Sequence, residues 1–370
     1  MGRRVTLALV KPNGEPLGTT RPYDVEPQWW QEVQPVVEGA RDELGIDVVV
    51  LRLVASENPL PHGGGITYLA EYDGPALDLG PFDPDWIKPH PLRMTWAQPG
   101  GPAASLRWAG AETGVQQRTW HLSSVWRLDG AWLKEAPPFL KHEAIVLEWL
   151  GKHVPDLVPR VLKADGSRLL MAHVPGIDQY DAEPAEVVEM AVDLVEIQAL
   201  AAGHVDELIA LGVPDWRENP FIERVSATID AYAEQLAADE RQRLAKLVDG
   251  LPQRFEQLAD CGIPDSLVHG DFHPGNVRSD GTRRVILDWP DSVIGHPVLD
   301  LRGPELDERW SALWRKEIPG CEPERALAVK RPLVALRGAA VYHDFLVGIE
   351  PTERPFHVAD PLNHLRSAIS

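Results

Sequence analysis

Cysteine and long apolar runs are both scarce in this chain of 370 residues. Its two cysteines, Cys261 and Cys321, are too few for a disulfide framework or a thiolate metal site, and lone thiols fit a reducing compartment. No apolar run is long enough to span a bilayer, and the run near the start ends at Lys11, too early for a signal peptide. We therefore expect a cytoplasmic protein with no membrane partner.

Positive charge is also in deficit. The chain has 36 Lys and Arg against 56 Asp and Glu, which gives a net charge of −20. Without a dense basic run, binding to nucleic acid or to an anionic membrane is not expected, and small-molecule substrates fit better. The 34 prolines and 30 glycines stay below the fraction that indicates disorder, so a folded protein of two or three domains is expected.

The most informative segment is LVHGDFHPGNVRSDGTRRVILD, at residues 267–288. Short apolar runs at residues 266–268 and 285–287 predict two buried strands. The proline, glycine and aspartate between them predict turns. The segment therefore predicts a strand, a loop and then a hairpin, with polar side chains where the first and last strands end.

Three of these polar residues have the order that phosphoryl transfer requires. The reaction needs a carboxylate to orient the attacking hydroxyl, and magnesium ions held on the phosphates by oxygen ligands. Asp271 precedes Asn276 by the spacing that protein kinases use, and Asp288 ends the following strand. We expect Asp271 to be the catalytic residue and Asn276 and Asp288 to hold Mg²⁺.

Two other interpretations of the same segment are open. His269, Asp271 and His273 alternate, so in an extended strand they would face one side, as the ligands of a metal-dependent hydrolase do. The proline and glycine that follow interrupt such a strand, and Asn276 would have no role. Alternatively, Asp271 only forms a turn and His269 is a buried histidine with satisfied hydrogen bonds.

The run HGDFHPGN followed by ILDWPDSVIGHPVLDL resembles the aminoglycoside phosphotransferase and choline kinase family, a branch of the protein-kinase-like fold. The resemblance implies transfer of the terminal phosphate of ATP or GTP to a hydroxyl of a small molecule, with Mg²⁺ as cofactor. It also implies an α+β bilobal fold in which His269 and Asp300 brace the catalytic loop. A smaller lobe that grips the nucleotide should then precede this loop.

The sequence supplies the parts of such a lobe. Residues 123–128 and 131–135 predict two strands joined by a two-residue Asp-Gly turn, and Lys134 lies on the second. A helix is predicted over residues 139–150, with Glu143 on or beside its buried face. By the resemblance, Glu143 pairs with Lys134 and aims its ammonium group at the nucleotide phosphates.

One departure from the kinase pattern concerns glycine. The stretch RTWHLSS, residues 118–124, has none where kinases carry a glycine-rich turn, and we expect the Ser123 and Ser124 hydroxyls and amides to bind phosphate instead. The segment LLMAHV, which includes Met171 and His173, is predicted to be the hinge whose backbone binds the purine. The missing glycines leave a nucleotide-binding regulatory pseudokinase as an alternative, although the retained acids argue against it.

The acceptor should be bound after the family motif. Glu305, Asp307 and Glu308 lie at a predicted helix start, where acids also complement the helix dipole. Alternatively, they bind a cationic acceptor such as an amino sugar, an aminoglycoside or an amino alcohol. Both interpretations are open at this stage.

The first third of the chain exceeds what a kinase-like lobe needs. It predicts an α/β pattern, with a helix over residues 29–44 and strands at 5–10, 48–54 and 67–72. The piece GARDELGIDVVVL resembles the back half of the Nudix signature but keeps only two of its acids, which implies a degenerate, non-catalytic domain. We expect an additional N-terminal Nudix-like domain at 1–112, a nucleotide-gripping lobe at 113–175 and an α-rich lobe at 176–370.

Overall fold

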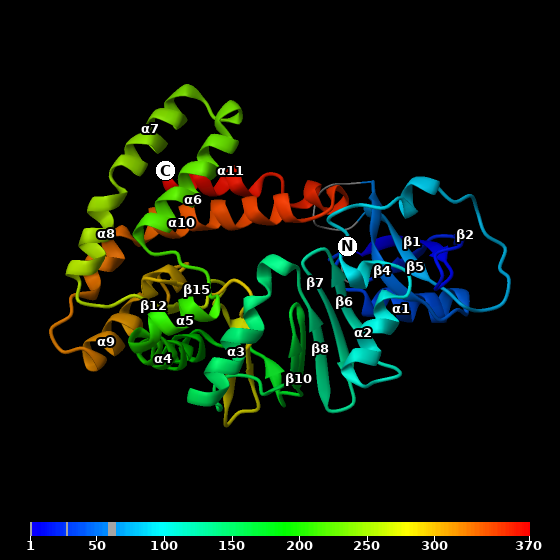
Figure 1. The fold of residues 1–370 in the computed structure, drawn as a ribbon, viewed down its shortest axis with the longest axis horizontal. Coiled ribbons are helices and arrows are strands. Elements are labelled where there is room, and N and C mark those ends of the chain that lie inside the picture. The colour runs from blue at the N-terminus through cyan, green and yellow to red at the C-terminus, as the bar shows by residue number, and fades with distance from the viewer. Residues whose placement is uncertain (1, 27–28, 58–63) are drawn as a thin grey trace. The chain divides into compact units, whose positions relative to one another are not determined.

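The computed structural model describes residues 2–26, 29–57 and 64–370. The chain forms two compact units, and each unit is assembled from three separate segments (Figure 1). Unit 1 comprises Met1–Phe139, Leu162–His173 and Phe345–Val358, and the remaining segments form unit 2. In the part of the chain that the structure describes, no helix is both long enough and apolar enough to cross a membrane.

The first sheet of unit 1 is five-stranded, with the order β2-β1-β5-β4 and β3 paired with β1. β1 runs parallel to β5, and the other pairings are antiparallel. The three strands predicted here are confirmed, whereas the predicted helix is shorter, because it begins only at α1 (Gln34–Gly39) and ends in a π-helical turn. The strands are β1 (Arg3–Val10), β2 (Pro16–Thr19), β3 (Tyr23–Val25), β4 (Val49–Ser56) and β5 (Gly64–Glu71).

Both faces of this sheet are buried. Val5, Leu7 and Leu9 of β1 pack into one apolar cluster, and the alternate residues Ala8 and Val10 pack into another, as the two-residue period of a strand requires. The second cluster is covered by residues from the proline-rich stretch after β5. That stretch contains the short helices η2 (Pro84–Ile87), η3 (Thr95–Ala97) and α2 (Gly101–Ala109).

The second sheet of unit 1 is antiparallel, with the order β6-β7-β8-β10-β9. Its strands β7 and β8 have the predicted bounds, and Gly130 at their turn has a φ of 65°. The side chain of Gln116 accepts from the Val50 amide at 2.9 Å and donates to the Val50 carbonyl at 2.6 Å, which joins this sheet to the first. The strands are β6 (Val115–Trp120), β7 (Ser123–Leu128), β8 (Ala131–Glu135), β9 (Val161–Asp165) and β10 (Arg168–Ala172).

A segment from near the C-terminus completes unit 1. The Phe356 ring stacks on Trp30 at 4.2 Å, at the end of the short helix η9 (Pro351–Phe356). The fully buried Glu353 accepts the His121 amide at 2.9 Å. No local sequence pattern predicts that these residues belong with strands more than 200 positions earlier.

Unit 2 is mainly helical, as predicted, and α10 and α11 run side by side (Figure 1). Its core contains Trp310, Trp314 and Leu333, all fully buried. Residues 185–211 and 221–258 each contribute to several helices. The helices are α3 (His142–His153), α4 (Pro184–Ala201), α5 (Val205–Leu211), α6 (Glu218–Ala231), α7 (Ala238–Asp249), α8 (Leu251–Asp260), α9 (Asp307–Glu317), α10 (Pro323–Gly348), whose end enters unit 1, and α11 (Asp360–Ala368).

Two small sheets in unit 2 frame the polar segment. The first pairs β12 (Ser266–Val268) with β15 (Val293–Gly295), and the second has the order β11-β13-β14. β13 (Val277–Ser279) and β14 (Arg284–Ile286) form the predicted hairpin, and β11 (Ile177–Asp178) extends it. The ends of β12 and β14 therefore carry the polar residues that the sequence indicated.

Candidate active site

A buried carboxylate fixes the loop that follows β12. Asp300 accepts from the main-chain amides of His269 at 3.0 Å and Gly270 at 2.7 Å, and from the Gln198 side chain at 2.8 Å. Its exposed fraction is 2%, so these donors replace the water that a buried carboxylate loses. This is the geometry that the predicted bracing role of Asp300 requires.

His269 is fully buried and both of its ring nitrogens are used. Nε2 donates to the Leu287 carbonyl at 2.9 Å, and Nδ1 accepts the Asp271 amide at 3.2 Å. Burial lowers the pKa of His269, which favours this neutral form. Because neither nitrogen is available to a metal, the metal-hydrolase interpretation loses its first ligand.

Asp271 sits on this loop with its side chain 28% exposed. The side-chain amide of Asn276 donates to the Asp271 main-chain carbonyl at 3.0 Å and lies 3.4 Å from Asp271 Oδ2. His273 Nε2 lies 3.7 Å from the same carboxylate oxygen. The other oxygen, Oδ1, forms an ion pair with Arg302. The carboxylate is thus held in place and still accessible.

Asp288 occupies an unusual turn after β14. With a φ of 63°, it is the one non-glycine residue of positive φ in the described ranges, which indicates a backbone held by its surroundings. On one side, the Leu287 amide donates to the Asn276 carbonyl at 2.7 Å. On the other, the amide of the buried Trp289 donates to Glu143 Oε1 at 3.2 Å. These bonds bring the turn of Asp288 to the Asn276 loop.

A third carboxylate, Asp291, was not predicted. Its pKa is raised to about 6, mainly by burial and also by the negative charges of Asp271 and Asp288, although Arg337 and Arg302 oppose the rise. This mutual repulsion identifies a site with an excess of negative charge, which a divalent cation would relieve. In the sequence, Asp291 is visible only as an acid three residues after Asp288, and this spacing does not by itself predict a function.

The donor set of this site fits magnesium. Within the described ranges, no group of three His, Cys, Asp or Glu side chains forms a ready metal cage. Magnesium is usually held by only one or two carboxylates together with water and phosphate oxygens. The Asp288 carboxylate and the Asn276 side-chain oxygen are hard ligands of this kind, so these residues would hold the ion.

A second missed residue, Arg337 of α10, supports the loop from behind. It is 5% exposed and donates through Nη1 to the Gly270 carbonyl at 2.9 Å and through Nη2 to the Asp291 carbonyl at 2.6 Å. Gly270 has a φ of 86°, and a Cβ there would lie 2.2 Å from the Asp291 oxygen. The loop, Asp291 and Arg337 therefore form one close-packed group.

The predicted pair Lys134 and Glu143 falls in two different units. Lys134 is partly exposed on β8, opposite Leu169 in the sheet of unit 1. Glu143 is 4% exposed on α3 of unit 2, where it binds the Trp289 amide. Pairing between the two remains a prediction, while the role of Glu143 beside Asp288 is an additional finding.

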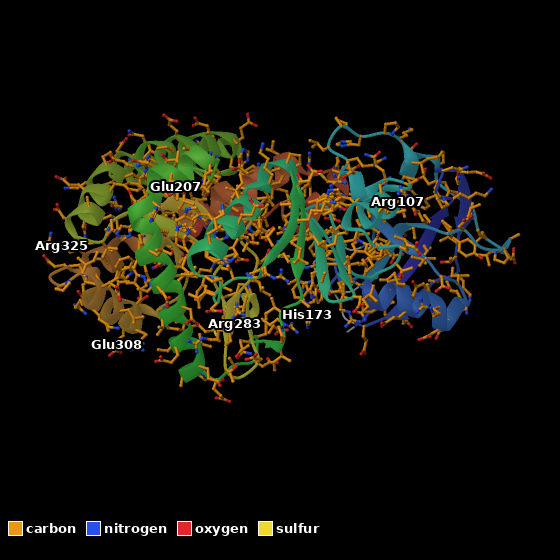
Figure 2. All side chains as sticks on the ribbon, turned by 60° about the horizontal axis from the view of Figure 1, so that its bottom comes forward. Arg107, His173, Glu207, Arg283, Glu308 and Arg325 are labelled. Atoms are coloured by element: carbon orange, nitrogen blue, oxygen red, sulfur yellow. The ribbon has the colours of Figure 1, made fainter. Side chains whose placement is uncertain are left out.

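The predicted nucleotide-binding residues lie in unit 1 and contact tryptophans. The indoles of Trp120 and Trp126 donate to the hydroxyl oxygens of Ser123 at 2.7 Å and Ser124 at 3.1 Å, respectively. Exposed His173, after β10 (Figure 2), accepts the Trp132 indole at 3.0 Å, and Met171 lies opposite Trp132 in the sheet. Their contacts with a nucleotide remain predictions.

The three acids proposed to bind the acceptor differ in their surroundings. Asp307 forms an ion pair with Lys330, which also donates to the Gly303 carbonyl at 2.9 Å. Glu308 is exposed at the outer surface of α9 (Figure 2), and the Glu305 side chain folds over Gly303. Among the three, Asp307 is the one with an ion-pair partner in the described ranges, and the half-buried Lys330 neutralises it.

Comparison with known proteins agrees with this site. The sequence matches the family described as "Phosphotransferase enzyme family" over residues 110–333. A comparison with curated protein sequences finds no match. The segment matched to the family contains Asp271, Asn276 and Asp288 in the order and structural setting described above.

Several solved structures are similar to the chain. Macrolide 2'-phosphotransferase MphH from Brachybacterium faecium is 17% identical, with 64% of this chain and 87% of that chain covered and a TM-score of 0.45. The streptomycin-ATP-APH(2")-IIa ternary complex is 15% identical, with 72% of this chain and 96% of that chain covered and a TM-score of 0.49. Choline kinase from Cryptosporidium parvum Iowa II is 10% identical, with 69% of this chain and 88% of that chain covered and a TM-score of 0.45. Because these TM-scores are below 0.5, the assignment rests on the family match, which spans more than half of the chain. The protein belongs to the phosphotransferase enzyme family.

Proposed function

We propose that this small-molecule kinase uses Asp271 as its catalytic residue, Mg²⁺ as its cofactor, and ATP or GTP as its co-substrate. The observation that carries the proposal is the placement of Asp271 on a braced loop, bonded to Asn276 and joined through Leu287 to the turn of Asp288. A carboxylate, an amide oxygen and a second carboxylate in this arrangement are the polar groups that phosphoryl transfer needs.

Asp271 performs the proton chemistry in this proposal. Its carboxylate accepts a hydrogen bond from the acceptor hydroxyl and takes up the proton as the new O–P bond forms and the bond from the terminal phosphorus to the leaving nucleoside diphosphate breaks. The proton then passes to solvent, since the Asp271 side chain is partly exposed. The acceptor becomes a phosphate monoester.

Asn276 and Asp288 hold the cation. When bound there, Mg²⁺ supplies positive charge to the phosphate oxygens. Asp300, His269 and Glu143 act indirectly, because each bonds to the backbone of the loop or turn that carries a reacting group. Lys134, Ser123 and Ser124 are proposed to bind the nucleotide from unit 1.

A cytoplasmic location would provide the Mg²⁺ and nucleotide that this reaction consumes. It is supported by the two cysteines, both free and buried, since a reducing compartment keeps such thiols unpaired. The acceptor is a small-molecule alcohol, and amino sugars, aminoglycosides and amino alcohols belong among the compounds to be tested.

The proposal is tested by following ATP consumption with and without magnesium and with and without added alcohols. A kinase consumes ATP only when magnesium and an acceptor are both present, and the product carries the phosphate. A regulatory pseudokinase consumes none, and a metal-dependent hydrolase needs no acceptor. Hydrolysis at the same rate without an alcohol would contradict the proposal.

A further inference from the structure

Arg302 contacts the catalytic carboxylate and keeps part of its guanidinium group free. Its Nη2 donates to the Gly270 carbonyl at 3.2 Å and forms the ion pair with Asp271 Oδ1. Nε and Nη1 make no hydrogen bond to any residue in the ranges that the structure describes. The side chain is 53% exposed, so these remaining donors are open to a ligand.

An exposed ion pair contributes little to the stability of the fold. The location of this pair, at the proposed catalytic residue, therefore points to a role in binding the acceptor. The acceptor hydroxyl must reach the Asp271 carboxylate, and whatever it is attached to then lies beside Arg302. A guanidinium group has a rigid, planar set of donors that matches the two oxygens of a carboxylate. Nε and Nη1 of Arg302 belong to the guanidinium group that contacts Asp271, so they lie close to the place where the acceptor's substituents must be.

Arg302 pairs with one oxygen of Asp271, and the two aromatic side chains near its guanidinium group, Tyr342 and His364, add no opposing charge. Tyr342 and His364 stack at 5.4 Å, and both are close enough for Arg302 to affect their ionisation. Burial raises the pKa of Tyr342 and lowers that of His364, so both side chains favour the neutral form. The negative charge of Asp360 acts on both members of this aromatic pair, and those of Asp271 and Asp291 act on Tyr342 as well.

A cationic acceptor finds less support here. Of the three acids that the sequence offered, Asp307 is paired with Lys330, Glu308 lies on the outer surface of α9, and the Glu305 side chain folds over Gly303. An ammonium group close to the reacting hydroxyl would instead be repelled by Arg302.

We propose that Arg302 determines acceptor specificity by binding an anionic group of the acceptor, a carboxylate a few bonds from the reacting hydroxyl. Hydroxy acids are then the preferred substrate class. The inference rests on the proposed function, because it needs Asp271 to be the residue that meets the hydroxyl. The ion pair also positions Asp271 before the acceptor binds.

The test uses acceptors matched in carbon skeleton and different in charge: glycerate, glycerol and aminopropanediol, and gluconate, sorbitol and glucamine. In the unmodified enzyme, kcat/KM for the carboxylate member should exceed that of its partners by about tenfold or more. Arg302→Gln should remove this preference, and Arg302→Lys should restore part of it. The preference is the ratio of kcat/KM for two acceptors of the same enzyme. If the substitution also impairs Asp271, both kcat/KM values fall together and the ratio does not change.

Arg309→Gln is the matched control, because Arg309 lies seven positions further along and pairs with Glu189 at 2.9 Å. It should leave the preference for carboxylates unchanged. A higher kcat/KM for the neutral or ammonium members, an unchanged ratio in Arg302→Gln, or failure to phosphorylate any hydroxy acid while Mg·ATP binds would overturn the inference. Transfer to a cationic acceptor would overturn it and leave the proposed function intact, whereas failure to bind Mg·ATP would overturn both.

Discussion

Glu143 accepts the main-chain N–H of Trp289 at 3.2 Å and thereby anchors the residue directly after Asp288. The two residues are far apart in the sequence, and both are buried. Asp288 has a positive φ, so its turn depends on such anchors to hold the carboxylate in place. Glu143 therefore has a positioning role in unit 2.

Replacing Glu143 with Ala should weaken the binding of Mg²⁺, because the turn that carries Asp288 loses one of its anchors. We expect the Mg²⁺ concentration for half-maximal activity to rise by about tenfold, since a hydrogen bond to a charged group is lost and the amide is left buried. Titration of activity with Mg²⁺ measures this. Glu148→Ala, on the exposed side of the same helix, is the control and should behave like the unmodified enzyme; equal shifts in both variants would contradict the positioning role.

Gly270 and Gly281 allow a clean comparison of steric effects. Both have positive φ, so Ala is strained at either position, but only at Gly270 would the Cβ collide, with the Asp291 carbonyl and Arg337. Gly270→Ala should lower kcat by about 10²-fold or more through displacement of Asp271. Gly281→Ala, with open space around its Cβ, should keep near-normal kcat. Steady-state kinetics of the two variants decide the matter, and similar kcat values would count against close packing of the loop.

Asp300→Asn tests the brace. The substitution puts an amide NH₂ where an oxygen now accepts a buried main-chain N–H, so at least one donor loses its partner. We expect a destabilisation of about 1–3 kcal/mol, visible in thermal unfolding. Asp260→Asn, exposed at the end of α8, should leave the melting temperature within about one degree. A melting temperature unchanged in Asp300→Asn would show that the loop does not depend on this carboxylate.

Glu353 should make stability depend on pH. Burial raises its pKa from the ordinary 4.5 to about 8, so folding favours the protonated form. That contribution is complete below pH 4.5 and is lost as the pH rises through 8. Relative to Glu353→Gln, the unmodified protein should lose several degrees of melting temperature between about pH 5 and 9. The same pH dependence in both proteins would contradict this; exposed Glu308→Gln is the control.

Local patterns in the sequence predicted the strands β7, β8 and β12 and the segment with Asp271, Asn276 and Asp288. These features depend on turn residues and on alternation over a few positions, which a single sequence displays. Arg302 was missed although it follows the family motif directly, because its role depends on the path of one exposed side chain.

Contacts between distant segments were not predictable in this way. Arg337 reaches Gly270 across 67 positions, and Glu353 reaches His121 across 232. The sequence pattern of a helix or a short turn does not indicate which distant residue it will contact, so only the folded structure reveals such pairs. The unusual φ of Asp288 also arises from the bonds around it and has no local signature.

The affinity for Mg·ATP in Asp271→Ala and Asp288→Ala tests the central claim most directly. If Asp271 acts only on the acceptor hydroxyl, its Ala variant should lose turnover by about 10²–10⁴-fold and keep a nearly unchanged Kd for Mg·ATP. Asp288→Ala should lose turnover and also bind Mg·ATP more weakly, because its carboxylate holds the cation. An equal loss of Mg·ATP binding in both variants, with the fold intact, would contradict the separate roles proposed for the two residues.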